Sequence, residues 1–382
     1  MIRKLFKQSQ CATVLVLSGV LSACGGNNVV VPVNKVATLS ATQEVSDVGS
    51  LAKGTGIISV NTDTGQISGS ITVVDMVATA AHIHLGAAGE NGAVIVPMTQ
   101  DAVIPAKWNI PTGATLTQDQ IASFKAGALY FNAHSVKFPA GEIRGQIGRE
   151  VALAHLSGSQ ENPQNSAAGT GLGVISLDPV TKTADITLTY ANIVPTAAHV
   201  HTGALAVSGP VTFQIGTPAA NKYAVSGVAF TDAQISDFRN KAMYFNIHTT
   251  DLPAGEIRGQ IGYQVRIANM NGAQENPPIT RPSTGVGFAA YDPDTKTVFG
   301  MLTVAGFTPT NAHIHRGAAG TNGAVLIPFT VSTTSALNWA SSGLVPLADA
   351  DAILLFEQGL YMNAHSALSP AGEIRGQLVP NK

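Results

Sequence analysis

The sequence predicts three tandem all-β domains, each a Greek-key β-sandwich with one short helix. Three observations lead to this fold. Glycine is frequent, with 39 residues in 382, and many short stretches rich in Val and Thr lie between turn-forming residues. Hydrophobic residues make up 45% of the chain and charged residues 12%, so the chain can bury sizeable cores. The same motifs also return three times in the same order, at a period of about 115 residues, which is the size of a whole domain.

The charge balance excludes one class of partner. The formal net charge is −2, and Lys and Arg together number 21 against 23 Asp and Glu. A nucleic-acid-binding domain needs clustered basic residues to neutralise phosphates. The sequence therefore predicts no nucleic-acid partner.

The N-terminal residues have the order of an export signal. A basic stretch with Arg3, Lys4 and Lys7 is followed by an apolar segment, from about residue 11 to 20, that is too short to span a bilayer. Small residues then precede Cys24, which resembles the bacterial lipoprotein signal. We expect a signal peptide over 1–23, lipidation of Cys24 and a tether over 24–35. An ordinary signal peptide that happens to contain a Cys is the alternative.

This signal predicts a location and an anchor. The mature protein is expected in the cell envelope, held to a membrane through its N-terminal lipid. By family resemblance, Gly25 after the cysteine fits sorting to the outer membrane, facing the periplasm or the surface. A protein or matrix partner is not identified by the sequence.

Cysteine chemistry is excluded from the folded part. The only two cysteines are Cys11, in the segment expected to be removed, and Cys24. The domains therefore contain no disulfide and no thiolate metal site, and their cores must hold them together.

Three motifs recur with nearly constant spacing. Glu44 and His82 are 38 residues apart, and the second and third copies keep this separation. The last histidine of each copy precedes an arginine by 10 residues, as in His134 and Arg144. These spacings predict domains over 36–149, 150–264 and 265–382. The repeated motifs are Gln43-Glu44, Gln160-Glu161 and Gln274-Glu275; Ala81 to His84, Ala198 to His201 and Ala312 to His315; and Tyr130 to His134, Tyr244 to His248 and Tyr361 to His365.

Local patterns predict the elements within a copy. Alternation over 56–60 and 67–73, with the turn 61–65 between them, predicts a β-hairpin. The sequences from Thr117 and from Thr231 read as helix capping boxes, and Asp349 opens the third helix. The apolar pairs expected to anchor these helices in the core are Ile121/Phe124, Ile235/Phe238 and Ile353/Phe356.

Nine of the ten histidines form a set of three in each copy, and His155 is the tenth. In a strand, His82 and His84 face the same side, about 7 Å apart, and sandwich topology can place His134 beside them. Three neutral imidazoles without a thiolate suit copper or zinc, with a coordination position left open. The predicted metal ligands are His82, His84, His134, His199, His201, His248, His313, His315 and His365. The alternative is that these imidazoles only form structural hydrogen bonds.

Two further positions are candidates for supporting this site. Asn132 shares a strand face with His134 and can orient its imidazole. Glu142 and Arg144 also share a face, and either pair with each other or lie beside the histidines. With their counterparts, the predicted supporting residues are Asn132, Asn246, Asn363, Glu142, Arg144, Glu256, Arg258, Glu373 and Arg375.

The motif order resembles the CHRD domain, named from the extracellular protein chordin. The resemblance covers nearly all of 36–380 in three copies and implies an extracytoplasmic, β-rich module. A more distant resemblance is to copper-zinc superoxide dismutase, in which a His-Val-His-like strand and a later lone histidine supply three copper ligands. The bridging histidine, the zinc ligands and the disulfide of that family are missing here. The Gly-Ala-Ala-Gly-x-Asn-Gly loop of the first and third copies is also lost from the second.

Together these features predict a non-enzymatic binding or structural protein with a copper or zinc site in each domain. One alternative is a copper-dependent redox enzyme of the superoxide dismutase type. Another is a multivalent adhesion or matrix module whose histidines are structural.

Overall fold

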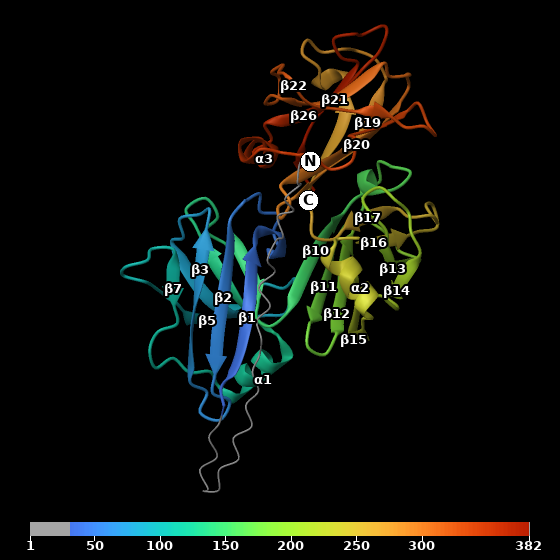
Figure 1. Ribbon diagram of the computed structural model, residues 1–382. Coiled ribbons are helices and arrows are strands. Elements are labelled where there is room, and N and C mark those ends of the chain that lie inside the picture. The colour runs from blue at the N-terminus through green and yellow to red at the C-terminus, as the bar shows by residue number, and fades with distance from the viewer. Residues whose placement is uncertain (1–30, 382) are drawn as a thin grey trace, which may run out of the picture. The chain divides into compact units, whose positions relative to one another are not determined.

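Each repeat is built from two groups of antiparallel strands whose apolar faces share one core (Figure 1). The computed structural model describes residues 31–381, so the expected signal peptide and Cys24 lie outside the described residues. Every strand pairing in the described chain joins two strands of the same repeat. The all-β prediction is confirmed.

In the first repeat, the two groups of strands join into one nine-stranded sheet at a corner. The contact is a single residue pair, Ser40 opposite Arg144. The first group, in order, is β1 (Val33–Ser40), β2 (Lys53–Val60), β3 (Ile67–Val74), β7 (Lys107–Asn109) and β6 (Thr99–Gln100). The second is β5 (Ala93–Pro97), β4 (Ala80–Leu85), β8 (Leu129–His134) and β9 (Ile143–Gln146). Strand β1 begins inside the segment that the sequence assigned to a tether.

The third repeat has the same strand order, and the second shares it except that its two groups form separate sheets and its first group has four strands rather than five. The second consists of β10 (Glu150–Leu156), β11 (Thr170–Asp178), β12 (Thr183–Ala191) and β15 (Lys222–Ala229), with β14 (Val211–Gln214), β13 (Ala197–Thr202), β16 (Met243–His248) and β17 (Ile257–Gln260). The third consists of β18 (Gln264–Asn271), β19 (Thr284–Asp292), β20 (Thr297–Ala305), β24 (Asn338–Ala340) and β23 (Thr330–Val331), with β22 (Val325–Pro328), β21 (Asn311–Arg316), β26 (Leu360–His365) and β27 (Ile374–Gln377). The short strands β25 (Val345–Pro346) and β28 (Val379–Pro380) pair with β20 and β18.

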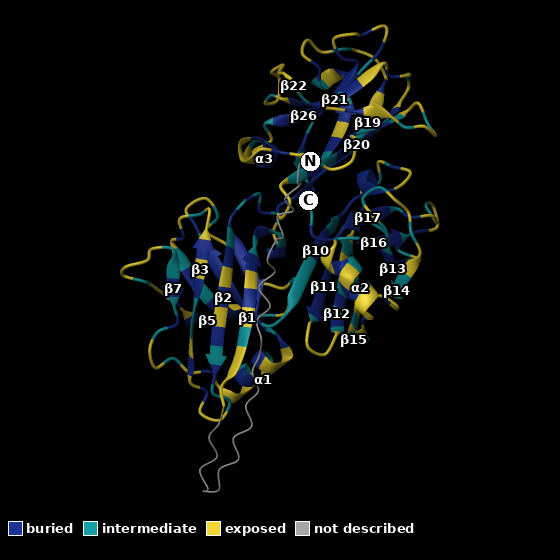
Figure 2. Ribbon diagram, viewed as in Figure 1, coloured by how far each residue is buried: buried dark blue, intermediate teal, exposed yellow. Residues whose placement is uncertain are grey.

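The cores follow from strand alternation, as Figure 2 shows by burial. Side chains alternate along β2, so Ile58 and Val60 are buried and Ile57 is exposed. The predicted hairpin turn forms between β2 and β3, where the amide of Gly65 donates to the carbonyl of Asn61 at 2.8 Å. Gly65 has φ of 75°, which favours glycine.

One short helix precedes the β8-type strand of each repeat: α1 (Gln118–Ala126), α2 (Asp232–Arg239) and α3 (Asp349–Phe356). The capping boxes of α1 and α2 form as predicted, with Thr117 and Thr231 as N-caps. Short 3₁₀ turns follow β1, β10 and β18: η1 (Ala41–Gln43), η2 (Gly158–Gln160) and η3 (Gly272–Gln274).

The predicted apolar pair of α3 was half right. Phe356 is buried, but Ile353 is 44% exposed, and Ala352 and Leu355 are buried instead. The N-cap is Ala348, so Ala352 and Leu355 occupy the positions that Ile121 and Phe124 occupy in α1. Asp349 is the first helical residue and not the cap, so the buried positions lie one residue earlier than a cap at Asp349 would place them. Among the described residues, no helix is long and apolar enough to cross a bilayer.

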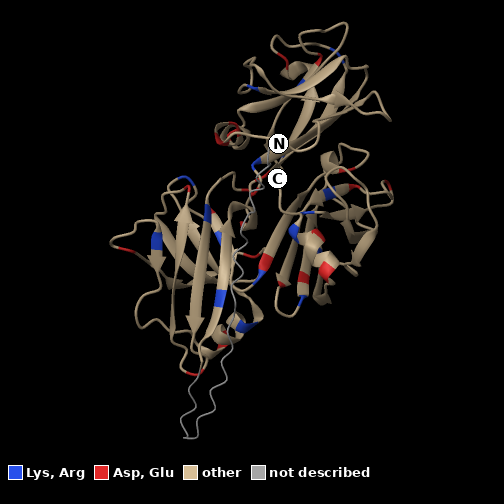
Figure 3. Ribbon diagram, viewed as in Figure 1, with Lys and Arg blue, Asp and Glu red and all other residues tan. Residues whose placement is uncertain are grey.

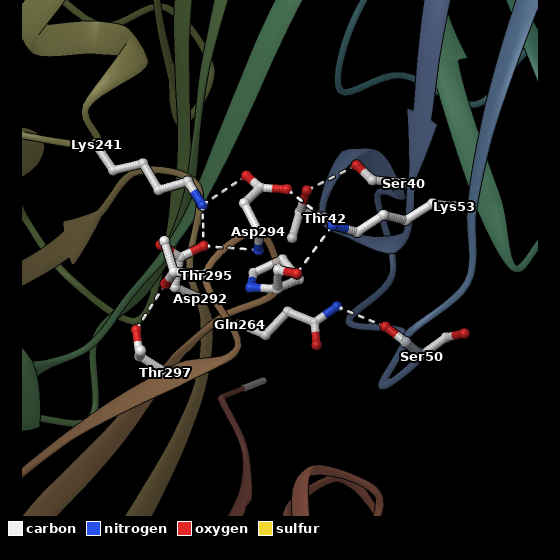
Figure 4. Close-up of polar contacts among 11 residues, drawn as sticks. Ser40, Thr42, Ser50, Lys53, Lys241, Gln264, Asp292, Asp294, Thr295 and Thr297 are labelled. Atoms are coloured by element: carbon white, nitrogen blue, oxygen red, sulfur yellow. Dashed lines mark hydrogen bonds and ion pairs between the residues drawn. The ribbon is translucent and has the colours of Figure 1, made fainter. Parts of the chain in front are cut away.

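Polar contacts also link residues of different repeats (Figure 4). Lys241 pairs with Asp292 and Asp294, and Lys53 bonds Asp294 at 3.1 Å. The fully buried Arg266 pairs with Asp47 at 2.8 Å. These contacts agree with the shortness of the linkers between successive repeats.

Candidate metal centre

The three histidines of each repeat meet on one sheet face. His82 and His84 lie on β4, and His134 ends the neighbouring strand β8. Because β4 and β8 are antiparallel, with Ala80 opposite His134, His134 is the diagonal neighbour of His82 on the same face. The ring centroids of His82 and His134 are 4.9 Å apart. The predicted convergence of three imidazoles is thus present in the first repeat.

Hydrogen bonds fix which nitrogens are free. Nδ1 of His84 bonds the carbonyl of Gly92 at 2.9 Å, and Nδ1 of His134 bonds the carbonyl of Pro139 at 3.1 Å. A carbonyl only accepts, so both Nδ1 atoms carry the proton and both Nε2 atoms keep a lone pair. Nε2 of His84 is buried and has no hydrogen-bond partner among the described residues.

His82 faces the other two imidazoles with Nδ1, whereas His84 and His134 face the centre of the triad with Nε2. Its Nδ1 lies 3.0 Å from Nε2 of His134. Two nitrogens bound to one metal at about 2.0–2.1 Å, with an angle between about 90° and 109°, are about 2.8–3.4 Å apart. The triad therefore offers Nδ1 of His82 and Nε2 of His84 and His134, and ligand atoms of the set all lie within 4.8 Å of one another.

The other two repeats reproduce this arrangement. The Nδ1 to Nε2 distance is 3.1 Å for His199 and His248 and 3.2 Å for His313 and His365. Nε2 of His201 and of His315 is likewise buried without a hydrogen-bond partner in the described chain. A threefold recurrence of an unpartnered buried nitrogen fits an absent ligand at that nitrogen.

Burial keeps the imidazoles in the neutral form that a metal needs. It is the main cause that lowers the pKa of His313 to about 4. Burial also lowers the pKa values of His82, His84, His134, His199, His201, His315 and His365. Protons therefore compete less with a metal here than at an ordinary imidazole.

A loop after β4 anchors His84. The backbone of Gly92 contacts the site twice, because its carbonyl accepts from His84 and its amide donates to the hydroxyl of Tyr130 at 3.0 Å. A side chain at Gly92 would place its Cβ 1.6 Å from the carbonyl oxygen of Leu85. Only glycine lets the loop approach the strand this closely.

The second repeat keeps this loop, although its sequence suggested a loss. His201 bonds the carbonyl of Gly209 at 2.9 Å, and the amide of Gly209 bonds Tyr244 at 3.0 Å. Ala206 takes φ of 58° where the first repeat has Gly89 at 77°. Backbone conformation and the last glycine are thus conserved between the repeats while the intervening residues change.

A tyrosine and an arginine lie behind His84, the buried histidine of the first triad. The ring of Tyr130 stacks on His84 at 4.8 Å, and the guanidinium of Arg144 lies 3.5 Å from the Tyr130 ring centroid. Arg144 is 1% exposed and donates to the loop carbonyls of Ala87 and Glu90. The corresponding sets are His201, Tyr244 and Arg258, and His315, Tyr361 and Arg375. These tyrosines were not predicted as site residues from the sequence, although their recurrence at the start of each third motif was a usable signal.

The predicted pairing of Glu142 with Arg144 does not form. Glu142 accepts from the hydroxyl of Ser50 at 2.6 Å, and Arg144 faces the loop instead. In the other repeats, Glu256 accepts from Thr249, and Glu373 pairs with Arg281. Strand β9 begins only at Ile143, so Glu142 lies outside the alternation that the prediction assumed.

The asparagine of each third motif bonds a buried carboxyl rather than an imidazole. Asn132 donates to Glu44 at 3.2 Å, and Asn246 and Asn363 donate to Glu161 and Glu275. Burial raises the pKa of Glu44, Glu161 and Glu275 to about 7 in each case. These pairs give the recurring glutamate of the Gln-Glu motif a structural role that was not predicted from the sequence.

Comparison with known proteins identifies the repeat. The family model of the CHRD domain matches three segments, residues 35–147, 152–261 and 267–378. No curated protein and no solved structure matches the chain.

Proposed function

The chain belongs to the CHRD domain family, with three tandem domains, and we propose that it is an exported binding protein whose domains each hold one transition-metal ion, copper or zinc. The observation that carries the metal proposal is the buried, unpartnered Nε2 of His84, His201 and His315, each beside two further imidazole nitrogens. Three imidazoles are a ligand set that both metals accept.

The protein's own residues prepare the site in three ways. The carbonyls of Gly92 and Pro139 fix the tautomers of His84 and His134, so both keep the Nε2 lone pair that a metal needs without changing tautomer. Burial disfavours the protonated forms of the imidazoles. The stacking of His84 on Tyr130 holds the His84 imidazole in place.

The export part of the proposal rests on the N-terminal sequence. The basic, apolar and small-residue order before Cys24 supports a lipid-anchored protein of the cell envelope, in the outer membrane, facing the periplasm or the surface. Metabolic labelling with a fatty acid tests this. We expect label in the wild-type chain and none in Cys24→Ser.

The metal proposal is tested by elemental analysis after loading with copper or zinc and removal of loose ions. We expect three ions per chain, and one fewer for each of His84→Ala, His201→Ala and His315→Ala. His155→Gln is the matched control, because His155 belongs to no triad, and it should retain three. A metal-free wild-type chain would leave the histidines structural and favour a multivalent adhesion or matrix module.

A second candidate is a copper-dependent redox enzyme. His82 and His134 are only half-buried, so one side of the triad is open to solvent and a fourth coordination position is accessible. Superoxide dismutation by the copper-loaded chain, lost in the triple His84, His201 and His315 variant, would support this candidate. Copper binding without turnover would support the binding protein.

A further inference from the structure

The charges around the triads distinguish between metal ions, provided that the triads bind metal as proposed above. We propose that each triad binds copper in its monovalent state in preference to divalent copper or zinc. The protein supplies no negative charge to the centre and places a buried cation behind it.

The ligands and their immediate partners are neutral. Three imidazoles carry no charge, and the nitrogens of His84 and His134 that do not face the centre bond carbonyls of Gly92 and Pro139. In sites for divalent ions, a carboxylate often accepts this second hydrogen bond and offsets charge. Carbonyls also fill this role in the other repeats: Gly209 and Pro253, and Gly323 and Pro370.

The cation behind the centre is Arg144. Its guanidinium is separated from His84 by the Tyr130 ring alone, and it forms no ion pair among residues 31–381. Its hydrogen-bond acceptors are neutral: two loop carbonyls and the amide oxygen of Gln146 at 3.0 Å. Its positive charge is therefore offset by no contacting carboxylate.

The Arg144 guanidinium therefore acts across the Tyr130 ring on any ion held by His84. Because Coulomb energy is proportional to charge, the arginine opposes a divalent ion twice as strongly as a monovalent one.

Other charged groups near the centre offset this field only in part. Glu44 faces Arg144 from the buried side, but burial raises its pKa to about 7, so it is partly neutral at pH 7. Lys137 and Glu90 are exposed, and solvent screens them. Figure 3 shows how sparse charged residues are over the described chain.

Coordination number favours the same ion. Zinc in proteins takes four ligands, and divalent copper adds a fourth in its plane. Monovalent copper has a filled d shell and is satisfied by three nitrogens. The triad supplies three.

The test uses the full chain with His201→Ala and His315→Ala, so that only the first triad remains. Affinities for monovalent copper, divalent copper and zinc are measured separately by competition with chromogenic chelators, without oxygen for monovalent copper. We expect monovalent copper to bind at least tenfold more tightly than either divalent ion. Tighter binding of zinc or divalent copper would overturn the inference but leave the metal site standing, whereas binding of none of the three ions would overturn both.

Variants in this background test the role of the arginine. Arg144→Gln should lower the ratio of monovalent to divalent copper affinity by tenfold or more, and Arg144→Lys should preserve it. Lys137→Gln removes one positive charge from an exposed side chain and should change the ratio less than twofold. If Arg144→Gln does not fold, Glu44→Gln at pH 8 gives the opposite test and should raise the ratio. An unchanged ratio in whichever of these two variants folds would overturn the electrostatic cause.

Discussion

Nδ1 of His82 lies 3.0 Å from Nε2 of His134, a separation that suits both a hydrogen bond and two ligands of one metal ion. Because Nδ1 of His134 already donates to Pro139, its Nε2 can only accept. In the metal-free protein, the proton between the rings therefore belongs to His82.

A tautomer change should follow from this relationship. Metal binding at Nδ1 of His82 requires the proton to leave that nitrogen, and Nε2 is then the protonated atom. We expect ¹⁵N chemical shifts of the imidazoles to show His82 changing tautomer on metal loading, with His84 and His134 keeping theirs. A His82 that keeps its Nδ1 proton in the loaded protein would contradict the assigned ligand atoms.

Metal retention should persist into mildly acidic solution. Burial lowers the pKa values of the three imidazoles of the first triad and of the third, that of His313 to about 4. Protons compete with a metal only near and below these values, so occupancy should remain high at pH 6, where an ordinary imidazole of pKa near 6.5 is mostly charged. Metal content after dialysis between pH 7 and pH 4 measures this. Half-release above pH 6.5 would be inconsistent with the burial of the triads.

Gly92→Ala should weaken the first site without touching a histidine. The new Cβ would meet the carbonyl oxygen of Leu85 at 1.6 Å, so the loop must move and His84 loses its acceptor. We expect at least a tenfold loss of affinity in a chain that keeps only the first triad. Gly113→Ala is the control, since its φ of 83° alone makes the change destabilising, whereas its Cβ meets nothing within 4 Å. Equal losses in the two variants would mean that general destabilisation is responsible.

How much the sequence predicts depends on the range of the interaction. Strand alternation and the Thr117 capping box are local patterns, and both were predicted correctly. The convergence of His134 with His82 was predictable because the fold class brings their strands together. The hydrogen-bond partners of Arg144 were not predictable, because its acceptors are backbone carbonyls of a loop. Every residue type has this carbonyl, so the sequence does not mark these acceptors.

The buried pair of Glu44 and Asn132 shows the same limit. The residues are 88 positions apart, and nothing in the Gln-Glu motif indicates that its carboxyl is buried. Ile353 was wrongly expected in the core of α3 for a smaller reason, because no capping side chain marks the first residue of that helix in the sequence.

Ala348→Ser should stabilise the third domain. Ala348 has the extended conformation of an N-cap, with φ of −65° and ψ of 149°, close to those of Thr117 and Thr231. No side chain caps α3, so a serine hydroxyl can accept the hydrogen bond that α1 and α2 receive. We expect a gain of about 1 kcal/mol in the free energy of unfolding. Thr117→Ala is the matched reverse change and should cost a similar amount, as measured by chemical denaturation.

Replacing the three buried glutamates by glutamine should remove a specific part of the pH dependence of stability. The pKa values of Glu44, Glu161 and Glu275 are raised by burial to about 7, above the usual value of 4.5. Between these values the folded state binds more protons than the unfolded state, so each carboxyl makes stability fall as pH rises, by up to about 1.4 kcal/mol per pH unit. The triad imidazoles whose pKa values burial lowers act in the opposite direction, but they are common to both proteins. The difference in free energy of unfolding between the metal-free wild type and the triple variant should therefore be small at pH 5 and grow in favour of the variant up to pH 8. A constant difference across this range would mean that the carboxyls are ionised in the folded protein throughout.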